Sequence, residues 1–83
     1  MNSDDRIRAV LEAHAKLRSP AAELTDSTDL YAAGMTSHAS VNVMLALEDA
    51  FDIEFPDELL TKHTFCTVQT IREALTGLVE VAA

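Results

Sequence analysis

The 83-residue chain has few cysteines, glycines and prolines and no tryptophan: one cysteine, two glycines and two prolines. A single cysteine cannot form an internal disulfide, so nothing in the chain requires an oxidising compartment. Gly34 and Gly77 stand alone, which excludes a glycine-rich phosphate-binding loop. The scarcity of glycine and proline also leaves no low-complexity linker. We therefore expect a single domain over residues 1–83, with an ordered core over about 5–79.

Basic residues are scarce as well, since six Lys and Arg face 14 Asp and Glu, for a net charge of −8. This balance excludes non-specific binding to nucleic-acid phosphates and disfavours binding to an anionic membrane surface. No apolar run approaches the roughly 18 residues of a membrane span, and Asp4 and Asp5 lie where a signal peptide has basic residues. We expect a cytoplasmic protein that binds neither nucleic acid nor membrane.

Apolar residues recur at helical spacing in three segments. The first segment is about 15 residues long and ends at Arg18-Ser19-Pro20, because proline disfavours helical geometry in the residue before it. Its predicted buried face consists of Ile7, Val10, Leu11, His14 and Leu17. A long connection to Thr36 follows, and four residues are spaced to anchor it to the core: Leu24, Leu30, Tyr31 and Met35.

The second segment, residues 38–51, is apolar around much of its circumference, which is typical of a helix with several neighbours. Ser37 is its predicted N-cap. The predicted stripe runs along Val41, Met44, Leu45, Glu48 and Phe51, broadened by Val43 and Leu47.

Residues 57–60 predict a brief helical turn, and Thr67 is the predicted cap of a last helix. The buried face of this last helix is predicted to be Val68, Ile71, Leu75, Leu78 and Val79. The sequence therefore predicts an all-α fold, a small four-helix bundle with three longer helices and one short helix.

Negative charge is concentrated in residues 19–61, which contain nine of the 14 acids and no Lys or Arg. A field of one sign attracts partners of the opposite sign. We predict an acidic surface on the second helix and its flanks; an ordinary solvated helix face is the alternative.

Patterns typical of catalysis or metal binding are absent from the sequence. The three histidines, His14, His38 and His63, match no zinc spacing, and the acids do not follow a calcium-loop order. Ser37 and His38 are neighbours, but adjacent helix residues point to different sides, and no orienting acid is evident. We predict that the chain is not an enzyme and has no metal site; a small hydrolase is the weakest alternative.

One ordered pattern surrounds Ser37. Asp29-Leu30 precedes Gly34-Met35-Thr36-Ser37, and the stretch 44–51, the pair Pro56-Asp57 and the residues 65–68 follow. Each part alone is weak, but their order and spacing over most of the chain resemble the acyl carrier protein and peptidyl carrier protein family.

The resemblance implies that Ser37 accepts a 4′-phosphopantetheine arm from coenzyme A through a separate phosphopantetheinyl transferase. The thiol of the arm would then hold an acyl or aminoacyl group as a thioester. Residue chemistry agrees, because a phosphodiester at a helix N-terminus lies at the positive end of the helix dipole. Gly34 can adopt backbone angles that a side chain would forbid, and the loop can thereby expose the Ser37 hydroxyl to another enzyme. The alternative is that Ser37 is only a cap.

Partner enzymes are expected to dock on the second helix and on the loop before it, as in the family. These partners are the transferase, an amino acid or acyl ligase that loads the arm, and a downstream acyl-transfer enzyme, each meeting a monomeric carrier. Contacts between an acidic face and basic patches are expected to be fast, weak and salt-sensitive. The candidate docking residues are Gly34, Met35, Thr36, His38, Val41, Glu48, Asp49, Asp52 and Glu54.

Two residues depart from the family signature, which has Asp before the modified serine and Leu after it. Here these residues are Thr36 and His38. With the stretches 31–41 and 55–60, they resemble free-standing bacterial carrier proteins that amino acid:carrier-protein ligases charge with glycine or alanine; polyketide-type carriers remain an alternative. A further alternative is a carrier-like interaction module that binds a basic partner protein and is never modified.

Overall fold

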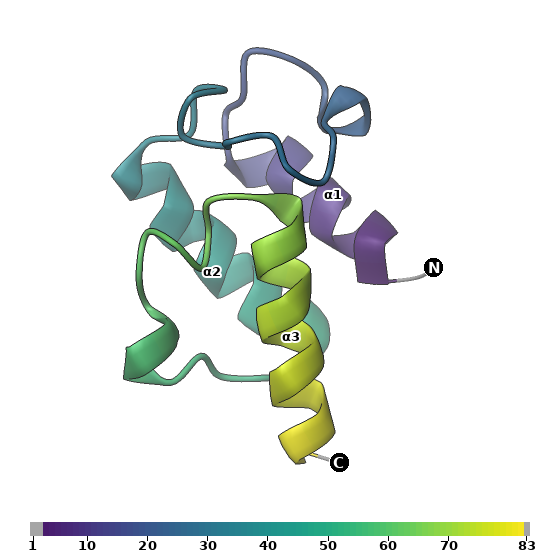
Figure 1. Ribbon diagram of the computed structural model, residues 1–83, viewed down its shortest axis with the longest axis vertical. Coiled ribbons are helices and arrows are strands. Elements are labelled where there is room, and N and C mark those ends of the chain that lie inside the picture. Colours follow the sequence, from purple (N-terminus) through teal and green to yellow (C-terminus); the bar gives the residue numbers. More distant parts are fainter. Residues whose placement is uncertain (1–2, 83) are drawn as a thin grey trace.

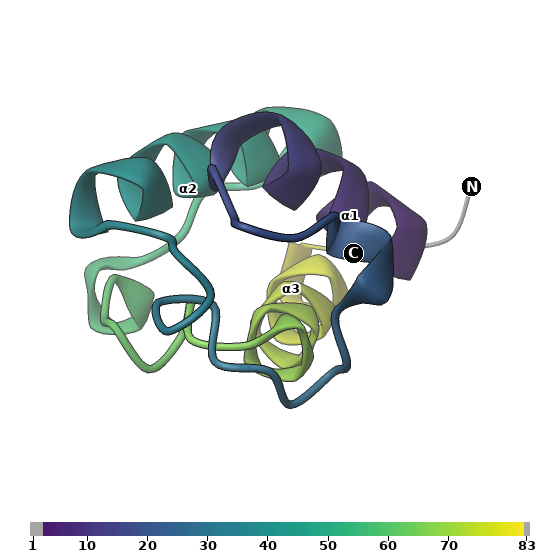
Figure 2. The same ribbon diagram turned by 90° about the horizontal axis from the view of Figure 1, so that it is seen from above.

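The computed structural model describes residues 3–82, and every regular element in this part of the chain is helical. Figures 1 and 2 show three longer helices joined by two extended connections, each of which contains one short 3-10 turn. The predicted all-α fold with three longer helices and a short one is confirmed, while the first 3-10 turn was not predicted. The elements are α1 (Ser3–His14), η1 (Ala21–Glu23), α2 (Ser37–Phe51), η2 (Asp57–Leu59) and α3 (Val68–Ala82).

Helix α1 packs against both α2 and α3. The connection from α1 to α2, drawn in blue in Figure 1, crosses one end of the bundle. The connection from α2 to α3 contains η2, and its residues 60–65 face the N-terminal half of α2. The start of α2 therefore lies where both connections meet the bundle.

Helix α1 ends at His14, earlier than the sequence predicts. Lys16 adopts a left-handed conformation with φ of 56°, which turns the chain out of the helix. The backbone N–H of Arg18 then bonds the carbonyl of Ala33 at 3.0 Å, so a partner outside the helix replaces the helical one. His14 is exposed and not part of the apolar face. Leu17 still packs against the core, but from the connection.

The predicted stripe of α2 is confirmed in part. Met44 and Phe51 are partly buried against the core, and Val43 and Leu47, which were predicted to broaden the stripe, are buried, but the prediction for Val41 and Leu45 is wrong. Val41 and Leu45 are 50% and 53% exposed, and the fully buried residues of the helix are Ala39, Val43 and Leu47. An almost continuously apolar helix gives no sequence signal for the face that its neighbours cover. Two large apolar side chains are therefore left on the outer face of α2.

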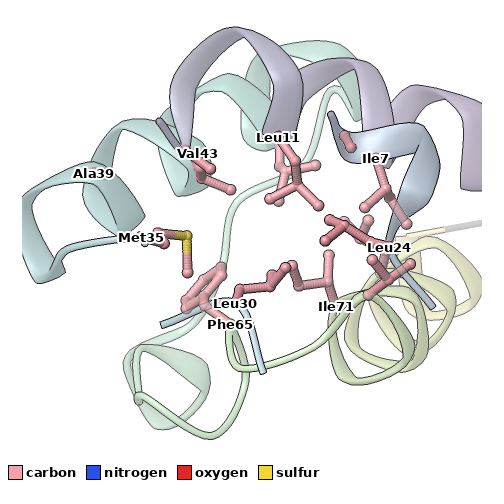
Figure 3. Packing of buried hydrophobic residues seen from close by; sticks show 14 of the residues in the cluster. Ile7, Leu11, Leu24, Leu30, Met35, Ala39, Val43, Phe65 and Ile71 are labelled. Atoms are coloured by element: carbon pink, nitrogen blue, oxygen red, sulfur yellow. The ribbon is translucent and has the colours of Figure 1, made fainter. Parts of the chain in front are cut away.

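The core lies between the three helices and is closed by the connections. Figure 3 shows Ile7 and Leu11 of α1, Val43 of α2 and Ile71 of α3 pointing into one interior. Leu30 enters it from the first connection and is completely buried. Each such side chain stabilises the fold by about 1.5–3 kcal/mol when it leaves water. The predicted anchoring of the first connection is confirmed by Leu24, Leu30 and Met35, which are buried, and Tyr31, which is half-buried.

The start of α3 is capped as predicted. The Thr67 hydroxyl accepts a hydrogen bond from the Thr70 N–H at 3.0 Å, and the Thr70 hydroxyl accepts one from the Thr67 N–H at 3.1 Å. The buried face of α3 contains Val68, Ile71 and Leu75, with Leu78 partly buried. The side chain of Val79, which was also predicted to be buried, lies outside the described residues.

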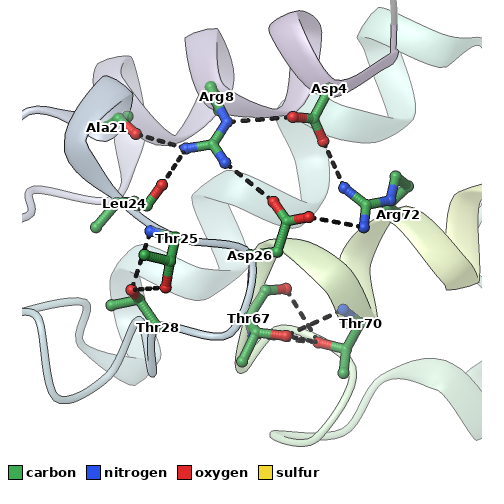
Figure 4. Close-up of polar contacts among 10 residues, drawn as sticks. All are labelled: Asp4, Arg8, Ala21, Leu24, Thr25, Asp26, Thr28, Thr67, Thr70 and Arg72. Atoms are coloured by element: carbon green, nitrogen blue, oxygen red, sulfur yellow. Dashed lines mark hydrogen bonds and ion pairs between the residues drawn. The ribbon is translucent and has the colours of Figure 1, made fainter.

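Four charged side chains join α1, α3 and the first connection (Figure 4). Arg8 contacts Asp4 and Asp26 at 3.3 and 3.1 Å, and Arg72 contacts the same two carboxylates at 2.7 and 3.0 Å. Hydrogen bonds from Arg72 and then Arg8 lower the pKa of Asp4, against the opposing effect of partial burial. Asp26, one of the nine acids of the predicted acidic segment, is therefore ion-paired with Arg8 and Arg72 within the fold.

Candidate functional site

Ser37 is the first residue of α2, but it is not the cap that the sequence predicts. The cap is Thr36, whose backbone is extended and whose hydroxyl accepts a hydrogen bond from the Ala39 N–H at 3.0 Å. The Thr36 carbonyl accepts the first helical bond, from the Ser40 N–H at 2.9 Å. Thr36, one of the two residues that depart from the family signature, thus caps the helix.

Because Thr36 caps the helix, the Ser37 hydroxyl is not needed to satisfy the N–H groups at the helix end. Ser37 is exposed, and within residues 3–82 its hydroxyl has no hydrogen-bond partner. Ser40, one turn later, differs because its hydroxyl donates to the Ser37 carbonyl at 2.7 Å. The N–H groups of Ser37 and His38 belong to the first turn and have no partner within the helix, so they remain available to an anion.

The loop before Ser37 depends on Gly34, whose φ is +123°. A β-carbon at this position would lie 3.4 Å from both the Arg18 nitrogen and the Lys16 oxygen. The predicted need for glycine is therefore confirmed, and its main cause is the positive φ, which strains any residue with a side chain, whereas the contacts to residues 16–18 are close but tolerable. Arg18 strengthens this contact by donating from its guanidinium to the Ala32 carbonyl at 2.9 Å.

Asp29 organises the preceding turn. Its carboxylate accepts hydrogen bonds from the N–H groups of Tyr31 and Ala32, at 2.9 and 3.2 Å. The next residue, Leu30, donates its N–H to the Cys66 carbonyl at 2.7 Å and ties the loop to the start of α3. Asp29 and Leu30 of the pattern around Ser37 therefore fix the position of the loop and of Tyr31.

A groove of about 390 Å³ opens beside Ser37. Lys62 lies at this groove, with its ammonium 4.9 Å from the centroid of the Tyr31 ring. The sequence analysis missed the groove and Lys62, although Lys62 is the only Lys or Arg between residues 19 and 71. The lining includes Ser37, Val41 and Met44 from α2 and Tyr31, Leu60 and Lys62 from the two connections.

The candidate acidic residues of α2 have different surroundings. Glu48 is half-buried, and its carboxylate accepts a hydrogen bond from the Phe55 N–H at 2.8 Å. Asp49 and Glu54 are exposed. Asp52 is also exposed and ends the helix with φ of 53°. Glu48 is therefore occupied by its own backbone, whereas the other three carboxylates face solvent.

The remaining candidate docking residues also fall into an exposed group and a buried group. Thr36, His38 and Val41 are exposed close to Ser37 along α2. Gly34 is half-buried against residues 16–18, and Met35 is only 2% exposed. The Met35 side chain belongs to the core and is not accessible to a partner.

Three further features of the described residues concern metal binding, thiol reactivity and membrane spanning. Among residues 3–82, no group of three His, Cys, Asp or Glu residues could hold a metal ion. Cys66 is half-buried, and burial, together with nearby Asp29, raises the pKa of its thiol, which disfavours the reactive thiolate. No helix in the described range is long and apolar enough to cross a membrane.

Comparison with known proteins points to one family. A family model described as "Phosphopantetheine attachment site" matches residues 5–75. A protein of Agrobacterium fabrum named "Aminoacyl carrier protein" is 45% identical over 69 residues, which are 83% of each chain.

Solved structures give the same result. A chain in the crystal structure of an engineered Bradyrhizobium japonicum glycine:[carrier protein] ligase complexed with carrier protein from Agrobacterium tumefaciens and ATP is 40% identical, with a TM-score of 0.90. The match covers 93% of the present chain and 100% of that chain. A chain in the structure of the B. japonicum ligase complexed with glycylated carrier protein is 30% identical, with a TM-score of 0.73 and coverage of 86% and 95%.

Proposed function

The chain belongs to the family of proteins with a phosphopantetheine attachment site, and we propose that Ser37 is the residue that bears the arm. It is a carrier protein and not an enzyme. The observation that supports Ser37 most directly is the division of tasks at the start of α2. Thr36 caps the helix, and the exposed Ser37 hydroxyl is left without a hydrogen-bond partner among the described residues.

The geometry around Ser37 suits a phosphodiester. Attachment joins the Ser37 oxygen to the phosphorus of phosphopantetheine, and the pyrophosphate bond of coenzyme A breaks, which releases adenosine 3′,5′-bisphosphate. The Ser37 hydroxyl proton passes to a base on the transferase, because no described side chain accepts it. The new negative charge then lies beside the unpaired N–H groups of Ser37 and His38, at the positive end of α2. When bound, the arm supplies a thiol that holds an acyl group as a thioester.

We propose that the cargo is an aminoacyl group, with glycine as the first candidate. Support comes from the relative named as an aminoacyl carrier protein and from the similarity to chains in complexes of a glycine:[carrier protein] ligase. A ligase of that kind would load this protein with an amino acid and ATP. A downstream acyl-transfer enzyme would then receive the group.

The proposed docking surface is the outer face of α2 together with the first residues after the helix. Its apolar part is formed by the exposed Val41 and Leu45, and its acidic part by Asp49, Asp52 and Glu54. A partner that combines apolar side chains with Lys and Arg would be complementary to it. Opposite charges accelerate encounter, while a small contact area keeps release fast, as a shuttle requires. We further propose that the protein is a monomer and acts in the cytoplasm.

Attachment can be tested by intact mass after incubation with coenzyme A, Mg²⁺ and a broad-specificity phosphopantetheinyl transferase. The wild-type protein and Ser40→Ala should each gain one phosphopantetheine, and Ser37→Ala should gain none. Ser40→Ala is the matched control because it removes a hydroxyl one turn away on the same helix. A wild-type protein that stays unmodified with several transferases, including that of its host, would support the unmodified interaction module instead.

Cargo can be tested on the modified protein with a glycine:[carrier protein] ligase, ATP and single amino acids. We expect a mass gain with glycine that is reversed by hydroxylamine, as a thioester requires. A gain with another amino acid, and none with glycine, would leave the carrier role intact and change the cargo.

A further inference from the structure

We infer that Arg18 is a positioning residue for the modification of Ser37, because it fixes the loop surface that an enzyme acting on Ser37 has to contact. This inference rests on the proposed attachment at Ser37. Its starting point is that Arg18 contacts three consecutive loop residues, Ala32, Ala33 and Gly34. Gly34 is only three residues before Ser37.

The end of α1 brings Arg18 to this loop. The left-handed conformation of Lys16, with φ of 56°, turns the chain out of the helix. The Arg18 N–H then donates to the Ala33 carbonyl at 3.0 Å, and the Arg18 guanidinium donates to the Ala32 carbonyl at 2.9 Å. A β-carbon on Gly34 would lie 3.5 Å from Cγ of Arg18, so the stem of the side chain runs beside the glycine. Arg18 therefore contacts the loop through both its backbone and its side chain.

The hydrogen bonds of the loop show what Arg18 adds to it. The N–H groups of residues 33–35 bond carbonyls of residues 29–31 at 3.0 to 3.2 Å, so they are satisfied inside the loop. The carbonyls of Ala32 and Ala33 take no part in these turns, and in the part of the chain that the structure describes both accept from Arg18. The turns fix the shape of the loop, and Arg18 fixes its place against the end of α1.

The guanidinium of Arg18 has no other hydrogen-bond or ion-pair partner among the described residues. The guanidinium groups of Arg8 and Arg72 form ion pairs that join α1, α3 and the first connection, whereas Arg18 is exposed and forms none within residues 3–82. It bonds only the Ala32 carbonyl of the loop. Removing the guanidinium is therefore expected to loosen residues 32–34 and to leave the packing of the helices unchanged.

The loop lies close enough to Ser37 to be covered by an enzyme. Three residues of extended chain span at most about 11 Å, which limits the distance of Gly34 from Ser37. An interface of standard size covers about 800 Å² on each protein, a patch with a radius of about 16 Å. An enzyme whose active site surrounds the Ser37 hydroxyl therefore also meets the loop at Gly34, where Arg18 holds it.

Order in this loop affects binding more than chemistry. If only a fraction of the free carrier molecules has the loop in the conformation that the enzyme binds, the apparent affinity falls by that fraction. The Ser37 hydroxyl itself belongs to α2, whose first turn is capped by Thr36, so its place in the bound complex does not depend on Arg18. Loss of the guanidinium is therefore expected to raise KM for the carrier and to leave kcat nearly unchanged.

The experiment measures modification of Ser37 by a phosphopantetheinyl transferase with coenzyme A and Mg²⁺, at several concentrations of the carrier. Arg18→Met removes the side-chain donors and keeps an apolar stem, and Arg18→Lys keeps a cationic donor. Arg6→Met is the matched control, because Arg6 is also exposed and also donates to a backbone carbonyl, that of Ala50 at 3.4 Å, near the other end of α2.

We expect Arg18→Met to raise KM about threefold to tenfold, the size of one net hydrogen bond, with kcat changed less than about twofold. Arg18→Lys should restore most of the affinity, and Arg6→Met should resemble the wild type.

A second measurement separates positioning from direct contact with the enzyme. Amide hydrogen exchange of residues 33–35, whose N–H groups close the turns of the loop, should accelerate by a similar factor in Arg18→Met and stay unchanged in Arg6→Met. The amides of the buried residues Val43 and Ile71, in α2 and α3, report whether the whole fold has loosened, and they should exchange as in the wild type.

The outcomes separate the two proposals. If the wild type gains no arm at Ser37, the proposed function fails before Arg18 is tested. A higher KM for Arg18→Met without faster exchange of residues 33–35 would mean that Arg18 touches the transferase directly. An unchanged KM would mean that the transferase does not use the order of the loop, and faster exchange at Val43 and Ile71 would assign the effect to global unfolding. Each of these three results leaves attachment at Ser37 intact and overturns the role inferred for Arg18.

Discussion

The carboxylate of Glu48 accepts a hydrogen bond from the backbone N–H of Phe55 at 2.8 Å and so ties the last turns of α2 to the chain that leaves it. Phe55 is buried and packs edge-to-face on Phe65, with the ring centroids 5.3 Å apart. A residue expected on the docking surface thus helps to hold the second connection in place.

Glu48→Ala is expected to lower the free energy of unfolding by about 1–3 kcal/mol, because it leaves the Phe55 N–H without its charged acceptor. Asp49→Ala is the matched control, since it removes an exposed carboxylate from the next position of the same helix and should change stability by about 0.5 kcal/mol or less. Urea unfolding followed by circular dichroism measures both. Equal effects of the two variants would mean that the Glu48 bond does not contribute to stability.

Thr36→Ala is expected to cost about 1 kcal/mol of stability, because the cap of α2 is lost. Thr36→Asp should keep most of that stability, since a carboxylate can accept the same Ala39 N–H and also favours the positive helix end. Chemical denaturation of the three proteins gives the comparison. If Thr36→Ala is as stable as the wild type, the cap assigned to Thr36 is wrong.

Gly34→Ala is expected to destabilise the protein by about 1–3 kcal/mol, because φ of +123° is strained for any residue with a side chain. Gly77→Ala is the control, because its helical site in α3 has open space around it, and there alanine should stabilise slightly. Thermal unfolding of both variants should give shifts of opposite sign; shifts of the same sign would contradict this account of Gly34.

Acid should weaken the ion-pair cluster of Asp4, Arg8, Asp26 and Arg72. The folded pKa of Asp4 lies below its ordinary value of 3.8, so the stability that this carboxylate contributes is present above that pH. It is lost as the pH falls through the lowered folded pKa. The stability difference between the wild type and Asp4→Asn should therefore shrink as the pH drops below about 4.

Urea midpoints between pH 2 and 7 test this expectation. Glu58→Gln is the control, because its side chain is exposed and lies outside the cluster, and its difference from the wild type should change less with pH. A difference for Asp4→Asn that is constant over the whole range would show that the ion pairs do not contribute.

Neutral amides at Asp49 and Asp52 are expected to slow loading of the proposed arm by a glycine:[carrier protein] ligase several-fold at low salt and much less at high salt, because exposed charges act over about 10 Å at 0.1 M. Asn also tolerates the left-handed conformation of Asp52, so the fold should persist. Loading rates at two salt concentrations measure the effect, with Asp57→Asn plus Glu58→Gln as an equal change of charge at η2. If both pairs slow loading equally, net charge and not the face of α2 controls docking.

Local chemistry in the sequence was sufficient for the three longer helices, for the short turn at residues 57–59 and for the family motifs around Ser37. Periodic apolar residues predicted the three helices, Thr67 predicted a cap, and Gly34 predicted an unusual backbone angle, since each signal depends on residues close in the chain. The order of short motifs around Ser37 was sufficient for the family.

Tertiary structure alone decided which side of α2 faces outward. The sequence predicted Val41 and Leu45 in the stripe of α2, but both are exposed, because an apolar circumference does not specify the side on which neighbouring elements pack. The hydrogen bond of Glu48 with Phe55 and the place of Lys62 at the groove depend in the same way on the second connection turning back along α2. Contacts between distant segments have no periodicity in the chain, so only the packed fold could separate the carboxylates that hold it from those that remain for a partner.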